Sequence, residues 1–129
     1  MRRSDVFAEI AHADEVYREL PFVYQTEQRT IHGVIDLLLR GADGQWRVVD
    51  YKTAALKVLP TPDALAEHAR RYHLQMGIYA AAVQELVGAA PLAVIHYVRY
   101  AQTVIIAENR WQQALAQLEV YIGDVIKDG

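Results

Sequence analysis

The stretch HGVIDLLLRGADGQWRVVDYKT, residues 32–53, decides the fold, and its pattern predicts two strands joined by a tight turn. One apolar run ends at Leu39 and a second begins at Trp46. Between them Gly41-Ala42-Asp43-Gly44 supplies turn residues, because Asp and Gly tolerate positive φ. Working outward from this hairpin, we expect one main β-sheet with the hairpin inside it.

Three charged residues interrupt these apolar strands. Asp36 lies inside the first run, and Asp50 and Lys52 end the second. Side chains alternate along a strand, so Asp50 and Lys52 point to the same face, and Asp36 can reach that face if the strands pair. Charges on apolar strands cost free energy unless they face one another or a metal. The pattern therefore predicts two acids and a lysine converging at a sheet edge, where they could hold a divalent cation and activate a water.

Each of these residues also has a simpler interpretation. Either aspartate alone could be a surface residue at a strand end, and Lys52 could be a solvated lysine. Their combination favours a metal site, and carboxylate oxygens suit Mg²⁺ or Mn²⁺ rather than zinc. In that site the Lys52 ammonium would orient the attacking water and stabilise charge at a phosphate.

The remaining chain predicts helices and strands around this hairpin. We expect a weak helix over 4–14, strands over 15–25, 92–100 and 102–107, a helix from Pro62 to Val87 ended by Gly88, and a last helix capped by Asn109. Pro21 gives the strand at 15–25 an edge position or a bulge. The order α-β-β-β-α-β-β-α indicates a mixed α/β (α+β-like) fold with one main sheet. Residues 1–129 are expected to form a single domain.

Four short segments carry a family resemblance. Gly33-Val34-Ile35-Asp36, Asp50-Tyr51-Lys52-Thr53 and Gln75-Met76-Gly77-Ile78-Tyr79 resemble the G-x-x-D, D-Y-K-T and Q-x-x-x-Y elements of RecB/AddA-type nucleases, and Arg18-Glu19-Leu20-Pro21-Phe22 resembles their lead-in segment. These nucleases belong to the PD-(D/E)XK superfamily. The resemblance spans about residues 15–80, and its four ordered elements are far more specific than D-x-K alone. It implies a restriction-endonuclease-like core, α-β-β-β-α-β(β)-α, with a central mixed sheet flanked by helices.

The resemblance also implies roles for individual residues. It makes Asp36, Asp50 and the backbone carbonyl of Tyr51 the metal ligands, with Lys52 as the catalytic partner of the two acids. Gln75 and Tyr79 would brace the metal site and contact DNA. They are helical neighbours at i, i+4, although Tyr79 also belongs to an apolar stripe.

Two further residues and one departure complete the candidate site. Arg71 is expected at the rim of the pocket as a DNA contact. Glu19 matches the family's Glu before Pro-Phe, and it could lie near the metal or simply solvate an edge strand. RecB-type domains also use an upstream histidine as a ligand, whereas only His12 precedes the motif here, at a shorter spacing.

Composition narrows the class of protein. The 129 residues are 53% hydrophobic and include no cysteine, which excludes disulfides and a cysteine-ligated iron–sulfur cluster and fits a reducing compartment. We therefore expect a cytoplasmic protein, and no apolar run approaches the ~20 residues of a membrane span. The net charge of −3 is unusual for a nucleic-acid binder, but from Lys52 to His73 four basic residues outnumber two acidic ones.

These observations favour a metal-dependent deoxyribonuclease domain, of the exonuclease kind found in DNA repair and recombination helicase–nucleases, or a stand-alone relative. DNA is the expected partner. The sequence has no P-loop, so any unwinding would belong to a helicase domain or subunit outside this chain. One alternative is a non-catalytic DNA-binding or assembly module on the same fold, and another is an unrelated α+β domain with chance motifs. The motifs are compatible with exo- or endonucleolytic cleavage and with DNA or RNA.

Overall fold

A computed structural model of the protein describes residues 6–57 and 59–128, with side chains described over 8–57 and 59–118. The elements are α1 (Val6–His12), β1 (Glu15–Gln25), β2 (Thr30–Arg40), β3 (Trp46–Lys52), α2 (Pro62–Ala69), the 3₁₀ turn η1 (Arg70–Tyr72), α3 (His73–Val87), β4 (Leu92–Tyr97), the 3₁₀ turn η2 (Val98–Tyr100), β5 (Gln102–Ile106) and α4 (Glu108–Asp128). Their order confirms the predicted succession of helices and strands.

The strands form one mixed sheet in the order β1-β2-β3-β4-β5. Neighbouring strands are antiparallel except β3 and β4, which are parallel and are joined by the long crossover through α2, η1 and α3. β1 is an edge strand, which is where Pro21 can be accommodated without losing a ladder hydrogen bond. The predicted mixed α/β fold is therefore confirmed.

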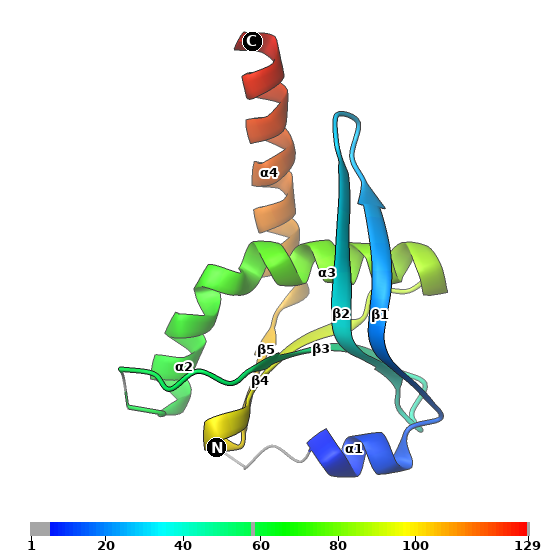
Figure 1. Ribbon diagram of the computed structural model, residues 1–129, viewed down its shortest axis with the longest axis vertical. Helices are drawn as coiled ribbons and strands as arrows, with labels where there is room; N and C mark the ends of the chain where they lie inside the picture. The colour runs from blue at the N-terminus through cyan, green and yellow to red at the C-terminus, as the bar shows by residue number, and fades with distance from the viewer. Residues whose placement is uncertain (1–5, 58, 129) are drawn as a thin grey trace.

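Helices cover both faces of the sheet (Figure 1). On one face α2 and α3 enclose a core, and α4 packs against α3. The buried apolar side chains of this core are Ile35, Leu38, Val48, Leu65, Ala69, Met76, Ala80, Val83, Ala93, Ile95, Tyr97, Ile106 and Trp111. A smaller core on the opposite face contains Leu37, Leu39, Val49 and Val94, with Ile10 of α1 packed against it. Burial on both faces explains why β4 is almost entirely apolar.

The β1–β2 hairpin bends away from the rest of the sheet. Its ladder pairs Arg18 with Leu37 and Leu20 with Ile35 but skips Glu19 and Asp36 between them, where Glu19 adopts a left-handed φ of 50°. Beyond this point β1 and β2 rise together while β3 runs in another direction (Figure 1). The pairing of β2 with β3 accordingly ends at Leu37 and Val49. We call the opening between Asp36 of β2 and Tyr51 of β3 the fork.

The predicted helix over 62–87 is interrupted. The predicted start is confirmed, since Thr61 accepts a 3.2 Å hydrogen bond from Ala64 N and Pro62 occupies the first turn. The predicted end is also confirmed, at Gly88 with φ 81°. Between them the 3₁₀ turn η1 separates α2 from α3, so the chain makes two helices that run in different directions (Figure 1). No Gly or Pro lies at this change of direction. We attribute the change to the packing of α2 and α3 against the sheet.

Other boundaries also differ from the sequence prediction. The helix expected over 4–14 spans Val6–His12, with residues 4 and 5 outside the described residues, and the strand expected over 102–107 ends at Ile106. The strand expected over 92–100 ends at Tyr97, where η2 begins. The last helix starts at Glu108, one residue before the expected cap at Asn109. These differences lie at element ends, where boundaries are the least determined by local sequence.

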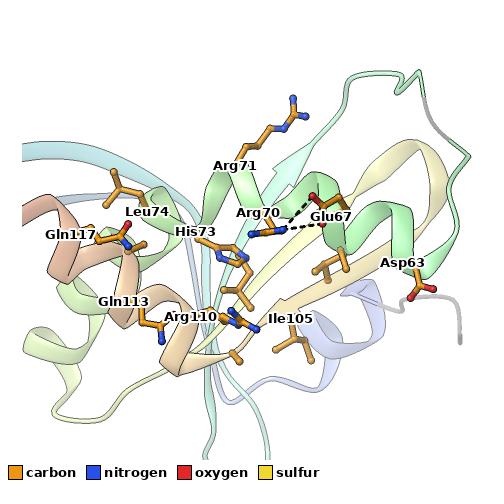
Figure 2. Close-up of a pocket in the computed structure, with 15 residues that line it drawn as sticks. Asp63, Glu67, Arg70, Arg71, His73, Leu74, Ile105, Arg110, Gln113 and Gln117 are labelled. Carbon is orange, nitrogen blue, oxygen red and sulfur yellow. Dashed lines mark hydrogen bonds and ion pairs between the residues drawn. The ribbon is translucent and has the colours of Figure 1, made fainter.

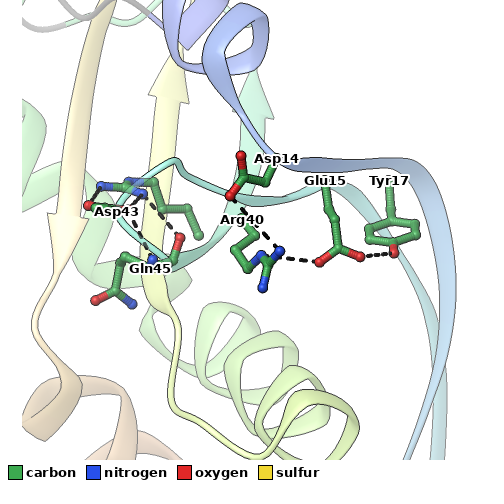
Figure 3. A network of polar contacts seen from close by, with 7 residues as sticks. Asp14, Glu15, Tyr17, Arg40, Asp43 and Gln45 are labelled. Carbon is green, nitrogen blue, oxygen red and sulfur yellow. Dashed lines mark hydrogen bonds and ion pairs between the residues drawn. The ribbon is translucent and has the colours of Figure 1, made fainter.

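Ion pairs tie the base of the hairpin together (Figure 3). Arg40 at the end of β2 lies 3.2 Å from the Glu15 carboxylate and 3.9 Å from that of Asp14, and Tyr17 donates a 2.7 Å hydrogen bond to Glu15. In the β2–β3 turn, Arg47 lies 3.2 Å from Asp43. Most of these side chains are exposed, so each pair contributes little free energy.

A tight helix crossing gives the first prediction. A Cβ at Gly77 of α3 would lie 2.8 Å from the carbonyl oxygen of Trp111 and 3.1 Å from Leu115 Cγ in α4. Gly77→Ala should therefore push α4 away and destabilise the fold by about 1–3 kcal/mol, the usual cost of overpacking. Urea unfolding measures this. Gly88→Asn is the matched control, because its open surroundings and left-handed backbone suit asparagine. An equal loss in both variants would contradict the crossing.

Candidate active site

The fork is held open by one carboxylate. Asp36 Oδ2 accepts a 2.9 Å hydrogen bond from the backbone N–H of Tyr51. Because the β2–β3 ladder has already ended at Leu37 and Val49, this side chain takes the donor that a continuing strand would have paired. Asp36 is thus fixed at the place where the two strands separate, beside the backbone of Tyr51.

Asp50 and Lys52 lie on the next strand and face the side covered by α3. Asp50 is only 5% exposed, and its Oδ2 lies 2.7 Å from Lys52 Nζ. That oxygen is buried and has no hydrogen bond of good geometry, so the close ammonium is an ion-pair contact only. The two-residue period predicted from sequence places both side chains on one face. A buried carboxylate oxygen in this state can accept a further cationic partner.

The charges around Asp50 are not balanced. Burial raises the pKa of the Asp50 carboxyl most strongly, Lys52 opposes the rise, and the nearby Asp36 carboxylate adds to it. The two acids therefore lie close enough to repel each other, and one ammonium does not fully compensate them. Such a pair of carboxylates favours the arrival of a second positive charge.

Helix α3 and the turn before it hold the Lys52 side chain. Gln75 Oε1 accepts a 3.3 Å hydrogen bond from Lys52 Nζ, and Gln75 Nε2 donates a 2.9 Å hydrogen bond to the hydroxyl of Tyr79. The ammonium also lies 4.0 Å from the ring centroid of Tyr72, a cation–π contact. Gln75 and Tyr72 thus restrict where the ammonium can point, and Tyr79 fixes the amide of Gln75.

A glycine in the hairpin supports the same helix. A Cβ at Gly33 would lie 2.6 Å from the Phe22 ring on β1, so only glycine leaves room for that ring. Phe22 in turn packs edge-on against Tyr79, with ring centroids 5.2 Å apart. The first residue of the G-x-x-D segment thus positions Tyr79 through Phe22, and Asp36 three residues later occupies the fork.

The structure brings together five of the eight residues singled out from sequence, namely Asp36, Asp50, Lys52, Gln75 and Tyr79. Tyr51 lies beside Asp36 through its backbone N–H, and the role of its backbone carbonyl as a metal ligand stays a prediction. Arg71 lies exposed on η1, and Glu19 lies exposed at the kink of β1. Within the described part of the chain, no three His, Cys, Asp or Glu side chains form a metal-binding group, so Glu19 does not join the two acids.

Sequence reasoning missed two neighbours of Lys52. Tyr72 lies under its ammonium, and His68 lies near enough for Lys52 and Arg71 to reinforce the lowering of its pKa that burial causes. The His68 Nδ1 atom is 2.9 Å from the hydroxyl of the buried Tyr97. Tyr72 and His68 are 3 and 7 residues before Gln75, and this spacing places them on the same helical face. The spacing is the sequence signal that could have predicted both neighbours.

The site fits a hard divalent cation. Its donors are carboxylate oxygens, one of them buried without a well-aligned hydrogen bond, and its two acids repel each other. Two side-chain carboxylates leave the other ligand positions to backbone oxygens and water, as Mg²⁺ prefers.

Comparisons with known proteins point in one direction. A family model described as the PD-(D/E)XK nuclease superfamily matches residues 1–125. The chain is similar to an ATP-dependent helicase/nuclease subunit from Oceanobacillus iheyensis, with 32% identity over 97 residues, which cover 64% of this chain and 8% of that protein. The protein of the same name from Desulfitobacterium hafniense is 38% identical over 81 residues, covering 57% of this chain and 6% of that protein. The chain therefore spans less than a tenth of these relatives.

The fold also has a counterpart among solved structures. A crystal structure of a candidate exonuclease from Eubacterium rectale superposes with a TM-score of 0.63 and 14% sequence identity. The match covers 93% of this chain and 47% of that one. At this identity the likeness concerns the fold.

Among the described residues, none of the helices has the length and apolar character of a membrane span.

The buried acid gives the second prediction. Because the pKa of Asp50 is raised, its ionisation costs stability, and this cost is present above that pKa, including at neutral pH. Asp50→Asn should therefore raise the melting temperature of the metal-free protein and abolish any further rise on adding Mn²⁺. Thermal unfolding with and without Mn²⁺ measures both.

The control for this prediction is an aspartate with the opposite electrostatics. A hydrogen bond from Arg47 and one from the Gln45 N–H lower the pKa of Asp43, so Asp43→Asn should reduce the melting temperature and keep the Mn²⁺ response. If Asp50→Asn has a lower melting temperature than wild type and Mn²⁺ still raises it, the ionised Asp50 does not cost stability and is not a metal ligand.

Proposed function

Because this chain belongs to the PD-(D/E)XK nuclease superfamily, we propose that it hydrolyses DNA phosphodiester bonds as a metal-dependent deoxyribonuclease domain, of the exonuclease kind. The observation that carries the proposal is the convergence of Asp36, Asp50 and Lys52 at the fork, with Lys52 Nζ 2.7 Å from a buried carboxylate oxygen. A purely structural ion pair does not require a second acid beside it.

Asp36 and Asp50 would hold the cation, Mg²⁺ or Mn²⁺, together with the backbone carbonyl of Tyr51. When bound, the cation supplies Lewis acidity for the phosphate and lowers the pKa of a water. The hydrogen bond from Tyr51 N fixes the orientation of Asp36. Because Asp50 is buried, water solvates its charge poorly, and a bound cation would stabilise that charge.

Lys52 would act on the attacking water and on the charge that develops at the phosphate. Its ammonium is already placed by Gln75 and by the ring of Tyr72, so little reorganisation is needed when the substrate binds. Tyr79 fixes the amide of Gln75 and thereby sets which atom of that amide faces Lys52. Gln75 and Tyr79 are positioning residues on this proposal, and Arg71 at the rim contacts DNA.

The comparisons support a role as the nuclease domain of a larger protein or complex. The two relatives described above are named helicase/nuclease subunits, and this chain spans 8% and 6% of them. We propose that the domain cleaves DNA delivered by a helicase domain or by a separate helicase chain, in DNA repair or recombination.

One observation favours a second candidate, a non-catalytic DNA-binding or assembly module. Among the described residues, no third acid or histidine joins Asp36 and Asp50 as a ligand. With only two side-chain ligands, the metal could bind too weakly for turnover. Activity measurements separate the two candidates.

The third prediction tests the proposed function directly. Wild type should degrade linear DNA with Mg²⁺ or Mn²⁺, spare circular DNA if it is an exonuclease, and be inactive in EDTA. Lys52→Ala should slow cleavage on the order of 10²–10³-fold, because it removes a preorganised stabiliser of transition-state charge. Since Lys52 is not a ligand, calorimetric Mn²⁺ binding should persist in Lys52→Ala and be lost in Asp50→Asn.

Two results would contradict this proposal. Cleavage by Lys52→Ala at the wild-type rate removes the lysine from catalysis. No cleavage by wild type with either metal, on single- or double-stranded DNA, favours the non-catalytic module.

The fourth prediction concerns the support from the hairpin. Gly33→Ala would place a methyl group against the Phe22 ring and displace that ring from Tyr79. We expect kcat to fall while Mn²⁺ affinity is retained, because the acids are untouched and the placement of Lys52 is disturbed. Combining Gly33→Ala with Phe22→Leu should restore part of the lost rate, since the smaller side chain relieves the clash. A rate unchanged by Gly33→Ala would remove Phe22 from the positioning chain.

A further inference from the structure

A groove of about 780 Å³ lies between two walls of the protein (Figure 2). One wall is formed by α2, η1 and the start of α3, and the other by β5 and the first turns of α4. None of Asp36, Asp50, Lys52, Gln75 or Tyr79 lines it. The groove is therefore a feature separate from the proposed catalytic centre.

Basic side chains face one another across this groove. Arg70 and His73 come from one wall and Arg110 from the other, and Figure 2 shows them turned toward a common centre. The pKa of His73 is lowered first by burial and then by Arg70 and Arg110, so His73 is largely neutral at pH 7. In a chain of net charge −3, two arginines therefore approach this groove from opposite walls.

The groove also contains two acidic side chains. Asp63 lies at the far end of α2, and Glu67 pairs with Arg70 at 3.3 Å (Figure 2). That pair is highly exposed, at 68% and 72%, and so it is weak and easily exchanged for another anion. Gln113 and Gln117 extend the groove along α4 with neutral hydrogen-bonding groups.

Arg71 connects the groove with the catalytic centre. It is part of the groove lining, yet Figure 2 shows its side chain turned away from Arg70 and Arg110. Its charge lowers the pKa of His68, as does the charge of Lys52, so a residue of the groove lining and the proposed catalytic lysine act on the same histidine.

We propose that this groove binds the backbone of single-stranded DNA several nucleotides from the bond being cleaved, an inference that rests on the proposed nuclease function. Phosphates contact Arg70 and Arg110, and Gln113 and Gln117 contact sugars or base edges. Arginine side chains on both walls suit the phosphates of a polyanion.

The test is the salt dependence of binding by the full chain, with Ca²⁺ in place of Mg²⁺ to limit cleavage. Fluorescence anisotropy compares labelled oligo-dT of four and twelve nucleotides over a KCl series. For Arg70→Gln/Arg110→Gln we expect the slope of log K against log salt for the longer strand to shrink by about 0.7 per lost phosphate contact. The slope for the shorter strand, which reaches only the catalytic centre, should not change.

Matched variants complete the test. Arg70→Lys/Arg110→Lys should restore the slope, and Arg29→Gln, a loss of charge in the β1–β2 turn, should leave it as in wild type. A photo-crosslinker on Gln113→Cys should capture the longer strand and not the shorter one. Bis(4-nitrophenyl) phosphate, a small diester, should be cleaved at the wild-type rate by Arg70→Gln/Arg110→Gln.

The outcomes separate the groove from the nuclease function. An unchanged slope for the longer strand in Arg70→Gln/Arg110→Gln, with no crosslink at position 113, overturns the groove proposal even if wild type cleaves DNA. That result is also expected if the groove instead binds another protein segment. A reduced slope in a protein that cleaves nothing supports the groove and overturns the nuclease function.

Discussion

The structure depends on one hydrogen bond at the fork, from Tyr51 N to the carboxylate of Asp36. A five-stranded sheet would normally continue its ladder, and a continuous ladder between β2 and β3 would leave no room for a substrate. The Asp36 side chain accepts the hydrogen bond from the Tyr51 N–H, so β2 can leave β3 without leaving that N–H without an acceptor. The kink at Glu19 in β1 lets the paired strands turn away together. Access and charge at the site thus come from the same residue.

Opening the sheet has an electrostatic consequence for Asp50. Its side chain stays buried on the α3 face, close to Asp36, and its pKa is raised despite an ammonium at 2.7 Å. The site is therefore less stable alone than a neutral replacement would be, which is common where function and stability compete. A bound cation would relieve this cost. The same imbalance explains why Lys52 needs Gln75 and Tyr72 to hold it, since its anion is shared with any metal that binds.

Much of this arrangement could be predicted from the sequence, because it follows from local periods. Alternation along a strand placed Asp50 and Lys52 on one face, and the i, i+4 spacing placed Gln75 beside Tyr79. The fork could not be predicted in this way. The residue type at position 19 does not predict a left-handed backbone, because that conformation depends on how both strands bend. Likewise the apolar stripe runs unbroken through Tyr72, so the division of the helix at η1 reflects packing against the sheet and not local propensity.

The division at η1 lies where the catalytic centre and the groove meet. Helical spacing by itself separates the two sides, because residues 68, 72 and 75 recur on one face and residues 70 and 73 fall on the opposite face. His68, Tyr72 and Gln75 accordingly lie near Lys52, whereas Arg70 and His73 line the groove beside α4. The 3₁₀ turn adds a change of helix direction between them, which the sequence does not predict. The helical period thus gives a small acidic protein basic side chains on both sides of one turn, and the turn sets the angle between those sides.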